Sequence, residues 1–222
     1  MTYRKLVLTN EETYHVFNRG VARAPIFNHA KDYQRFLDLL NYYRFAPKLS
    51  FSHYNRLENS AKQQYMQNLK KNNPPIAEIL AYCLMPNHFH LLLKQTKDHG
   101  IKLFISNLQN GYAKYFNTSS ERSGALFQAM FKAVRIETDE QLLHVSRYIH
   151  LNPSTAYIVE PENLLSYKWS SLPEYLGKVD AFFTNTQLVL ELAGGKDTYN
   201  EFVLDQTDYQ RELDKIKHLF IE

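Results

Sequence analysis

Hydrophobic residues recur along this chain with two different periods, and the two periods predict two kinds of element. Apolar residues spaced three or four apart indicate amphipathic helices over residues 32–45 and 101–115. Short segments that are continuously apolar or alternating, bounded by turn residues, indicate strands. These predicted strands are residues 14–20, 79–84, 88–94 and 126–136.

Two of the predicted strands follow one another directly and form a β-hairpin. Met85-Pro86-Asn87 joins them, and Pro and Asn are residues that tight turns favour. In the second strand His88 and His90 stand two residues apart, so both imidazoles point to the same face of the sheet. Two imidazoles on one face can bind a single divalent cation. The hairpin therefore carries a candidate metal site that lacks a third ligand.

A further helix is predicted to begin after Thr138, whose side chain can cap the helix while Gln141 reaches back. We expect this helix to end just before Asn152, because Pro153 disfavours helical geometry at the residue that precedes it. Tyr148 and Asn152 are four residues apart and therefore share one face of the last turn. A phenol is a candidate covalent nucleophile, and an amide oxygen is a candidate third metal ligand.

The remaining segments are more polar or less regular. Residues 48–75 are rich in Asn, Gln, Ser and Lys, which predicts a surface insertion, helical around residues 60–69. The last part of the chain is expected to form a helical appendage, with a charged helix near residues 199–220. The resulting domain prediction is a catalytic domain over residues 1–177, with an insertion at about 48–75, and a C-terminal helical extension over residues 178–222.

Composition narrows the class of protein without naming a function. The 222 residues carry a net charge of +3, which permits nucleic-acid binding without requiring it. The 16 Tyr and 14 Phe suit either base stacking or core packing. Cys83 is the single cysteine, which excludes an internal disulfide and a cysteine-based zinc cluster and fits the reducing cytoplasm. No apolar stretch predicts a signal peptide or a membrane span, so we expect a cytoplasmic protein.

Residues 81–93, with the sequence AYCLMPNHFHLLL, resemble the HUH signature of the single-tyrosine HUH transposases. The similarity is greatest to the branch called REP-associated tyrosine transposases. Further similar segments occur in the family's order, so that the resemblance extends over about residues 14–175 and is more specific than one short motif. These segments are residues 14–20, 112–117, 123–128, 147–153 and 169–171.

The resemblance implies a fold, a reaction and a set of site residues. The implied fold is α+β, a ferredoxin-like antiparallel sheet with helices packed on it. His88 and His90 would bind Mg²⁺ or Mn²⁺, Asn152 would complete the coordination, and Tyr148 would be the nucleophile. Members of the family cut one DNA strand near an imperfect hairpin. They retain a 5′-phosphotyrosine and release a 3′-OH, and a later attack by a 3′-OH rejoins the strands.

Several alternatives stand beside this assignment. Tyr112 and Tyr115 are rival nucleophiles, although their helical spacing favours core packing or base stacking. Asn152 can instead cap the C-terminus of its helix. At Ala129-Met130 the family often has Gly-Arg, so one expected DNA contact is in doubt. The basic residues that we consider for DNA contacts are Arg19, Lys114, Lys132, Arg135 and Arg147.

The sequence therefore predicts a metal-dependent enzyme that nicks single-stranded DNA with hairpin or palindromic repeats and transfers the strand. A different class of function is a nucleic-acid-binding regulator that keeps the fold without catalysis. A third is an unrelated metal hydrolase that uses the histidine pair and does not need Tyr148. Either a monomer or a homodimer fits the sequence.

Overall fold

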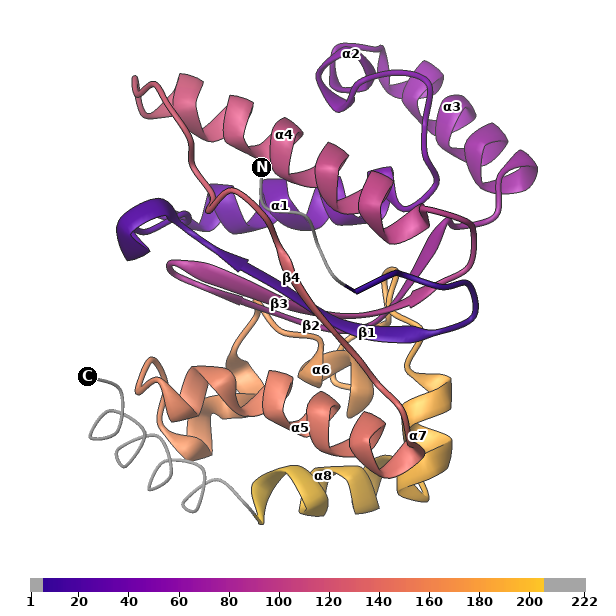
Figure 1. Ribbon diagram of the computed structural model, residues 1–222, viewed down its shortest axis with the longest axis vertical. Coiled ribbons are helices and arrows are strands. Elements are labelled where there is room, and N and C mark those ends of the chain that lie inside the picture. Colours follow the sequence, from indigo (N-terminus) through magenta and orange to yellow (C-terminus); the bar gives the residue numbers. More distant parts are fainter. Residues whose placement is uncertain (1–5, 206–222) are drawn as a thin grey trace. The chain divides into compact units, whose positions relative to one another are not determined.

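The computed structural model describes residues 6–205, which form an α+β structure with four strands in one antiparallel sheet. The strands are β1 (Thr13–Arg19), β2 (Ala77–Met85), β3 (His88–Gln95) and β4 (Lys132–Arg135), and their order in the sheet is β2-β3-β1-β4. With a helical connection between β1 and β2 and another between β3 and β4, this order is the ferredoxin-like topology that the family resemblance implies (Figure 1).

Eight α-helices and two 3₁₀ helices lie within the described residues. The α-helices are α1 (Ala30–Tyr43), α2 (Phe51–Asn55), α3 (Asn59–Asn72), α4 (Gly100–Ser119), α5 (Asp139–Thr155), α6 (Leu172–Tyr175), α7 (Gln187–Ala193) and α8 (Lys196–Leu204). The 3₁₀ helices are η1 (Val21–Arg23) and η2 (Pro161–Ser166). None of the helices between residues 6 and 205 combines the length and the hydropathy that crossing a bilayer requires.

By its internal contacts the chain divides into two compact units. The first comprises residues 1–78, 86–88 and 93–134, and the second comprises residues 79–85, 89–92 and 135–222. The first unit therefore holds β1 and the helices α1 to α4. The second holds most of β2, the middle of β3, and the helices α5 to α8.

In the first unit α1 packs along α4 (Figure 1), and aromatic rings fill their interface. The rings of Phe36 and Tyr112 meet edge to face with centroids 5.0 Å apart, and Phe27 lies 5.3 Å from Phe36 in the same geometry. Such edge-to-face pairs add a favourable electrostatic term to the burial of apolar area. The helical spacing that predicted α1 and α4 thus reflects the faces that these two helices bury.

The polar insertion after α1 contains the short helix α2 and the longer helix α3, as the sequence predicted for its second half. Tyr42 attaches the insertion to α1, because its hydroxyl donates a hydrogen bond to the carbonyl oxygen of Leu49 at 2.9 Å. Its ring also lies 4.9 Å from that of Tyr54. Leu69 is the buried residue of α3, so this helix is held by few apolar contacts.

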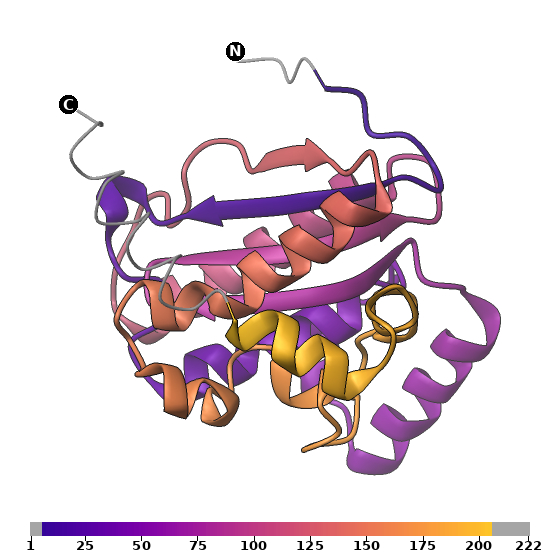
Figure 2. The same ribbon diagram turned by 90° about the horizontal axis from the view of Figure 1, so that it is seen from below.

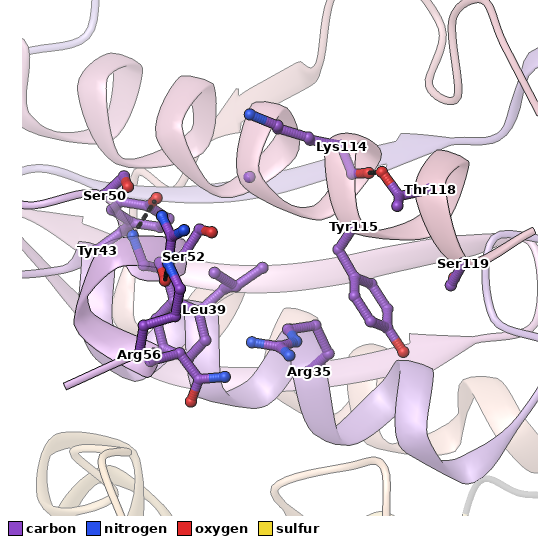
Figure 3. Close-up of a pocket in the computed structure, with 13 residues that line it drawn as sticks. Arg35, Leu39, Tyr43, Ser50, Ser52, Arg56, Lys114, Tyr115, Thr118 and Ser119 are labelled. Atoms are coloured by element: carbon purple, nitrogen blue, oxygen red, sulfur yellow. Dashed lines mark hydrogen bonds between the residues drawn. The ribbon is translucent and has the colours of Figure 1, made fainter. Parts of the chain in front are cut away.

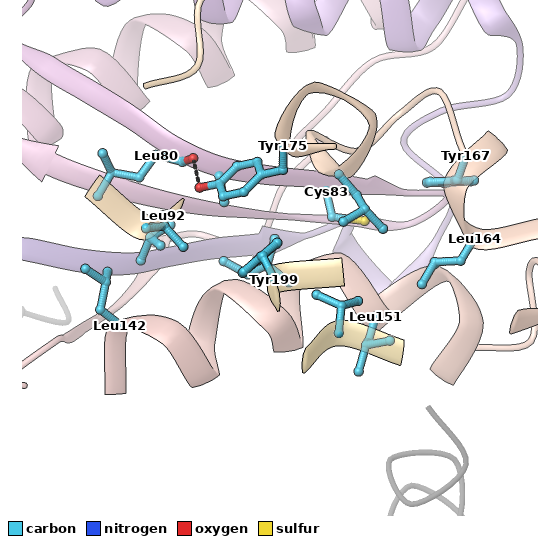
Figure 4. Close-up of a cluster of buried hydrophobic side chains, with 14 of the residues drawn as sticks. Leu80, Cys83, Leu92, Leu142, Leu151, Leu164, Tyr167, Tyr175 and Tyr199 are labelled. Atoms are coloured by element: carbon cyan, nitrogen blue, oxygen red, sulfur yellow. Dashed lines mark hydrogen bonds between the residues drawn. The ribbon is translucent and has the colours of Figure 1, made fainter. Parts of the chain in front are cut away.

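In the second unit α5 shares one hydrophobic core with the residues of β2 and β3 that belong to this unit. Figure 4 shows Leu80, Cys83 and Leu92 from the strands among this buried cluster. Tyr175 and Tyr199 also belong to it and are fully buried. Because continuous burial is typical of strands covered on both faces, these strands read as unbroken apolar runs in the sequence.

The helices α7 and α8 are part of this core and not an appendage to it. Both contact α5 and each other (Figure 2), and Val189 and Val203 are buried in the same cluster as the apolar residues of α5. The division into a catalytic domain over residues 1–177 and an extension over residues 178–222 stays a prediction. Most of the charged helix expected near residues 199–220 lies outside the described residues.

Two predicted element boundaries were wrong. The helix α5 does not stop before Asn152 but continues through Pro153 to Thr155, where burial of residues 149–154 outweighs the missing backbone donor. Helical bonding resumes beyond the proline, since the N–H of Ala156 donates to the carbonyl oxygen of Asn152. The predicted strand over residues 126–136 is reduced to β4 and one isolated bridge between Phe127 and Gly20.

The beginning of α5 follows the prediction closely. The N–H of Gln141 donates to the side-chain oxygen of Thr138 at 3.1 Å. The side-chain oxygen of Gln141 in turn accepts from the N–H of Glu137 at 2.7 Å, one residue earlier than in the usual capping box. Two backbone donors at the helix start are satisfied in this way.

A buried histidine ties α5 to the rest of the second unit. His150 is fully buried, with Nδ1 2.8 Å from the hydroxyl of Tyr199 and Nε2 2.8 Å from the hydroxyl of Ser171. Burial disfavours the charged imidazolium and lowers the pKa of His150 from 6.5 to about 3. The folded protein therefore keeps this imidazole neutral at a pH where the unfolded chain binds a proton.

We expect this difference to weaken the fold in acid. Stability from neutral His150 is present above pH 6.5, the pKa of the unfolded residue, and is lost as the pH falls below it. The free energy of unfolding should fall by about 1.4 kcal/mol per pH unit from this residue alone. Urea denaturation between pH 7 and pH 5 would measure it, with His150→Gln as the control. An identical pH dependence in the variant would contradict the assignment.

Candidate active site

The structure brings one of the two strand histidines into contact with the proposed nucleophile. His90 on β3 and Tyr148 on α5 both belong to the second unit, and their rings meet edge to face with centroids 5.6 Å apart and planes at 87°. His90 is 6% exposed, whereas Tyr148 is half-buried. A phenol from one element thus lies beside an imidazole from another, although 57 residues separate them in the chain.

The packing of α5 explains why Tyr148 reaches the strand. Ile149 and Leu151 point into the hydrophobic core of the second unit, and Tyr148 packs against the edge of that core. His150 fixes the rotation of the helix through its two buried hydrogen bonds. The direction of the Tyr148 side chain is therefore set by neighbours that do no chemistry themselves.

Asn152 lies one turn beyond Tyr148 on α5. Its side-chain Nδ2 donates a hydrogen bond to the carbonyl oxygen of Tyr148 at 2.7 Å, and the residue is 8% exposed. This bond fixes the orientation of the amide, so that Oδ1 is the atom that remains to accept a hydrogen bond or a cation. Because α5 ends at Thr155 and its C-cap is Ala156, Asn152 does not have the alternative role of helix cap.

His88 belongs to the first unit, where the side chain of Asn87 orients it. Nδ2 of Asn87 donates to the carbonyl oxygen of Arg23 at 3.1 Å, which turns Oδ1 of the same amide toward His88. That oxygen is 2.6 Å from Nδ1 of His88 and can only accept, so Nδ1 carries the proton. The lone pair of the imidazole is therefore on Nε2, the nitrogen that can coordinate a cation.

The electrostatic surroundings of His88 also favour its neutral form. Burial is the main cause that lowers the pKa of His88 from 6.5 to about 4, and the positive charge of Arg19 adds to the effect. Arg19 itself is exposed at the end of β1. An uncharged imidazole with a cationic neighbour fits a site that receives an anionic group.

The donor set of this chain fits a divalent metal only if an amide contributes. Among residues 6–205, no three side chains of His, Cys, Asp or Glu gather into a metal-binding group. The second unit offers the imidazole of His90 and the amide oxygen of Asn152 as neutral donors, and the first unit offers the imidazole of His88. Such a set leaves coordination positions for water and for a phosphate oxygen.

The two rival tyrosines are engaged elsewhere in the first unit. Tyr112 is fully buried and its hydroxyl donates to the carbonyl oxygen of Ile26. The hydroxyl of Tyr115 donates to a carboxylate oxygen of Asp32 at 2.9 Å. Burial and this carboxylate raise the pKa of Tyr115 above its usual value of 10. Neither phenol is therefore prepared to act as a nucleophile.

The basic residues considered for DNA contacts fall into two groups. Arg19, Lys114, Lys132 and Arg135 are exposed. Arg147, by contrast, is 8% exposed, and its guanidinium lies 4.0 Å from the centroid of the Phe202 ring. The same group donates to the carbonyl oxygen of Phe202 and lies 2.8 Å from Nδ1 of His144. Arg147 thus joins α5 to α8, and we leave it out of the proposed DNA contacts.

Sequence reasoning did not single out Asn87 as a site residue. It treated this residue only as part of the turn between β2 and β3. An amide directly before a candidate metal-binding histidine, in a two-residue turn, was the available signal. Its contact with Arg23 depends on a segment 64 positions away and is not visible in the sequence.

Comparison with known families shows one similarity. Residues 45–152 match the family model described as "Transposase IS200 like". This segment of the chain is therefore similar to the IS200-like transposases. The matched segment contains His88, His90, Tyr148 and Asn152, so every residue proposed for the chemistry lies inside it. No curated protein matches the chain.

Two solved structures are similar to the chain, and the first of them shares its fold. A REP-associated tyrosine transposase bound to a REP hairpin matches with a TM-score of 0.53 and 13% sequence identity, over 83% of this chain and 97% of that one. A transposase structure from Deinococcus radiodurans R1 matches with a TM-score of 0.36 and 17% identity, over 67% of this chain and 95% of that one. The first of these likenesses supports the α+β fold described above.

The contacts of Arg147 lead to a prediction about stability. We expect Arg147→Ala to lower the free energy of unfolding by about 1–3 kcal/mol, because the cation–π contact and the hydrogen bonds to α8 are lost. Lys132→Ala removes the same charge from an exposed position and should alter the free energy of unfolding by no more than about 0.5 kcal/mol. Urea denaturation of the two variants measures the difference. Equal stabilities would show that the Phe202 contact contributes nothing.

Proposed function

We propose that this protein is an IS200-like transposase, a metal-dependent enzyme that nicks single-stranded DNA and transfers the cut strand through a covalent tyrosine intermediate. The observation that carries the proposal is the contact between the rings of Tyr148 and His90. A nucleophile must lie beside the group that holds the reacting phosphate, and proximity of this kind supplies much of the rate of an enzymatic displacement.

In the proposed reaction the hydroxyl oxygen of Tyr148 attacks the scissile phosphorus. The bond from phosphorus to the 3′ oxygen breaks, and that oxygen leaves with a proton as a 3′-OH. The phenol loses its proton to solvent or to a neighbouring base, and the DNA remains joined as a 5′-phosphotyrosine. Attack by a 3′-OH on this ester reverses the chemistry and restores a phosphodiester, so no nucleotide cofactor is needed.

His88, His90 and Asn152 are the proposed ligands of the metal ion. A bound Mg²⁺ or Mn²⁺ would neutralise the scissile phosphate, whose negative oxygens otherwise repel a nucleophile. Asn87 holds His88 in the tautomer with a lone pair on Nε2. The hydrogen bond from Asn152 to the carbonyl oxygen of Tyr148 couples the third ligand to the helix that carries the nucleophile.

The proposed substrate is single-stranded DNA with a hairpin or palindromic repeat. Similarity to a transposase family supports DNA as the substrate class, and the structurally similar tyrosine transposase is bound to a REP hairpin. Arg19 is the leading candidate for a phosphate contact, because it is exposed and acts electrostatically on His88. Lys132 and Arg135 of β4 are further candidates.

The competing function is a DNA-binding regulator that has lost catalysis. It would have no need for the paired contacts that orient Tyr148, His88 and Asn152. Incubation with a single-stranded hairpin oligonucleotide and Mn²⁺, followed by a denaturing gel, separates the two functions. Cleavage with a covalent protein–DNA adduct supports the enzyme, and binding without either product supports the regulator.

The nucleophile is tested by Tyr148→Phe. We expect this change to abolish the adduct and to lower cleavage by about 10³-fold or more, because it removes the attacking oxygen alone. Binding of the hairpin should remain within about twofold of the wild type. Tyr115→Phe is the matched control and should still form the adduct. Undiminished metal-dependent cleavage in Tyr148→Phe would instead indicate a hydrolase that activates water.

The role of Asn87 is tested by a pair of substitutions. Asn87→Ala removes the acceptor for Nδ1 of His88 and should weaken Mn²⁺ binding by about 10–100-fold. Asn87→Asp keeps an acceptor at this position and should restore most of the affinity. Calorimetric titration with Mn²⁺ measures both without reference to activity. Equal affinities for the alanine and aspartate variants would rule out the orienting role.

A further inference from the structure

A second candidate binding site lies in the first unit, among α1, α2 and α4. It is a pocket of about 480 Å³, a size typical of small-molecule sites, and it is open to solvent on one side. Figure 3 shows side chains from these elements around it, with Arg35 and Tyr115 on one part of the wall and Ser50 and Arg56 on another. None of the residues proposed for catalysis lines this pocket.

The charge of the pocket wall is entirely positive. Arg35, Arg56 and Lys114 line it, and no carboxylate does. A shallower adjoining pocket shares Arg35 and adds Lys31 and Asp38, so the wider surface still has more cations than anions. Because the net charge of the whole chain is only +3, this concentration of cations around one cavity favours an anionic ligand.

Arg35 is held in place by two aromatic rings. Its guanidinium carbon lies 5.0 Å from the centroid of Phe51 and 4.8 Å from that of Tyr115. Two such cation–π contacts reduce the freedom of a long side chain, so less entropy is lost when it binds a ligand. A planar guanidinium beside an aromatic ring is also a surface on which a nucleic-acid base can stack.

Close packing behind the pocket depends on a glycine inside α4. A Cβ atom at Gly111 would lie 3.1 Å from Cε2 and 3.3 Å from the hydroxyl of Tyr43, which is tighter than ordinary contact. That hydroxyl accepts a hydrogen bond from the N–H of Phe51 at 3.2 Å and so fixes the start of α2. A glycine inside a helix costs about 1 kcal/mol relative to alanine, which the close approach of Tyr43 explains.

We propose that this pocket binds one unpaired nucleotide. Arg56 and Lys114 would contact the phosphate, and the base would lie against Arg35 and Tyr115. Hydroxyl groups on the wall, such as those of Ser50 and Ser52, provide hydrogen bonds to the sugar or the base edge. Positive charge, aromatic rings and hydroxyls together match a nucleotide, whereas an acidic peptide would use the charge alone.

The nucleotide can come from two sources, a single-stranded segment of DNA or a free mononucleotide. A strand is the source that fits the proposed function, and the inference rests on that function for the identity of the substrate. It does not rest on Tyr148 or on the histidines. The pocket would hold a part of the strand other than the phosphate that reacts.

The test is the double variant Arg56→Ala/Lys114→Ala in the full chain. Both side chains are exposed, so folding should be unaffected, and thermal unfolding checks this. Fluorescence anisotropy with labelled dT15 should show about tenfold weaker binding at 0.1 M salt and a salt dependence reduced by about 0.7 in log–log slope, the value for one phosphate contact. Lys70→Ala/Lys71→Ala removes the same charge from exposed positions of α3 and should bind almost as the wild type does.

Competition experiments distinguish the sources of the ligand. Displacement of labelled dT15 by unlabelled dT15, but not by millimolar dTMP, identifies a strand, and displacement by both identifies a site that also accepts a free nucleotide. Equal displacement by inorganic polyphosphate at the same phosphate concentration would overturn the role of the base. If Arg56→Ala/Lys114→Ala and Lys70→Ala/Lys71→Ala lose the same affinity for dT15, the pocket is not the binding site.

The same variants separate this inference from the proposed function. A wild-type protein that binds dT15 through the pocket but does not cleave hairpin DNA would leave the pocket standing and refute the nicking reaction. If cleavage occurs, the pocket variant should raise KM for the oligonucleotide about tenfold and leave kcat unchanged. The reason is that the pocket residues bind the strand equally in the ground state and in the transition state. A lower kcat with unchanged KM would contradict a binding role.

Discussion

The two-residue turn Pro86-Asn87 is the constraint on which the first unit and the register of the hairpin depend. The carbonyl oxygen of Pro86 accepts from the N–H groups of Ile26 and Phe27, and that of Asn87 accepts from Gly20. The turn therefore gathers the segment after β1 onto the end of the hairpin. Because β3 begins directly after it, the turn also sets which residues of β3 face which side, and a shift of one residue would exchange them.

The sequence predicted most of the fold, and the predictions that the structure does not follow have a common cause. The hairpin, α1, α4 and the start of α5 follow from periodicity, turn residues and caps, which act over a few residues. The continuation of α5 through Pro153 and the inclusion of α7 and α8 in the core depend on burial against distant segments. Local rules do not contain that information, because tertiary packing outweighs them where enough apolar area is buried.

In the candidate site, too, the sequence predicts local features and does not predict those that depend on distant segments. The family resemblance and the spacing on strand and helix pointed to His88, His90, Tyr148 and Asn152. What the sequence did not show is how these side chains are oriented, by Asn87 and by the buried bonds of His150. It also did not separate Arg147 from the exposed cations, since a charge that is covered by an aromatic ring looks the same in the sequence as one in solvent.

The hydrogen bonds of His150 make the orientation of Tyr148 depend on segments that lie later in the chain. His150 lies two positions after Tyr148, and its partners Ser171 and Tyr199 lie in segments that contribute no proposed catalytic group. The helix that carries Tyr148, the proposed nucleophile, is thus oriented by Ser171 and Tyr199. That part is free to diverge at its surface, but an insertion or a domain exchange that moves α8 also turns the nucleophile. Recombination among related enzymes should therefore preserve residues 139–204 as one block.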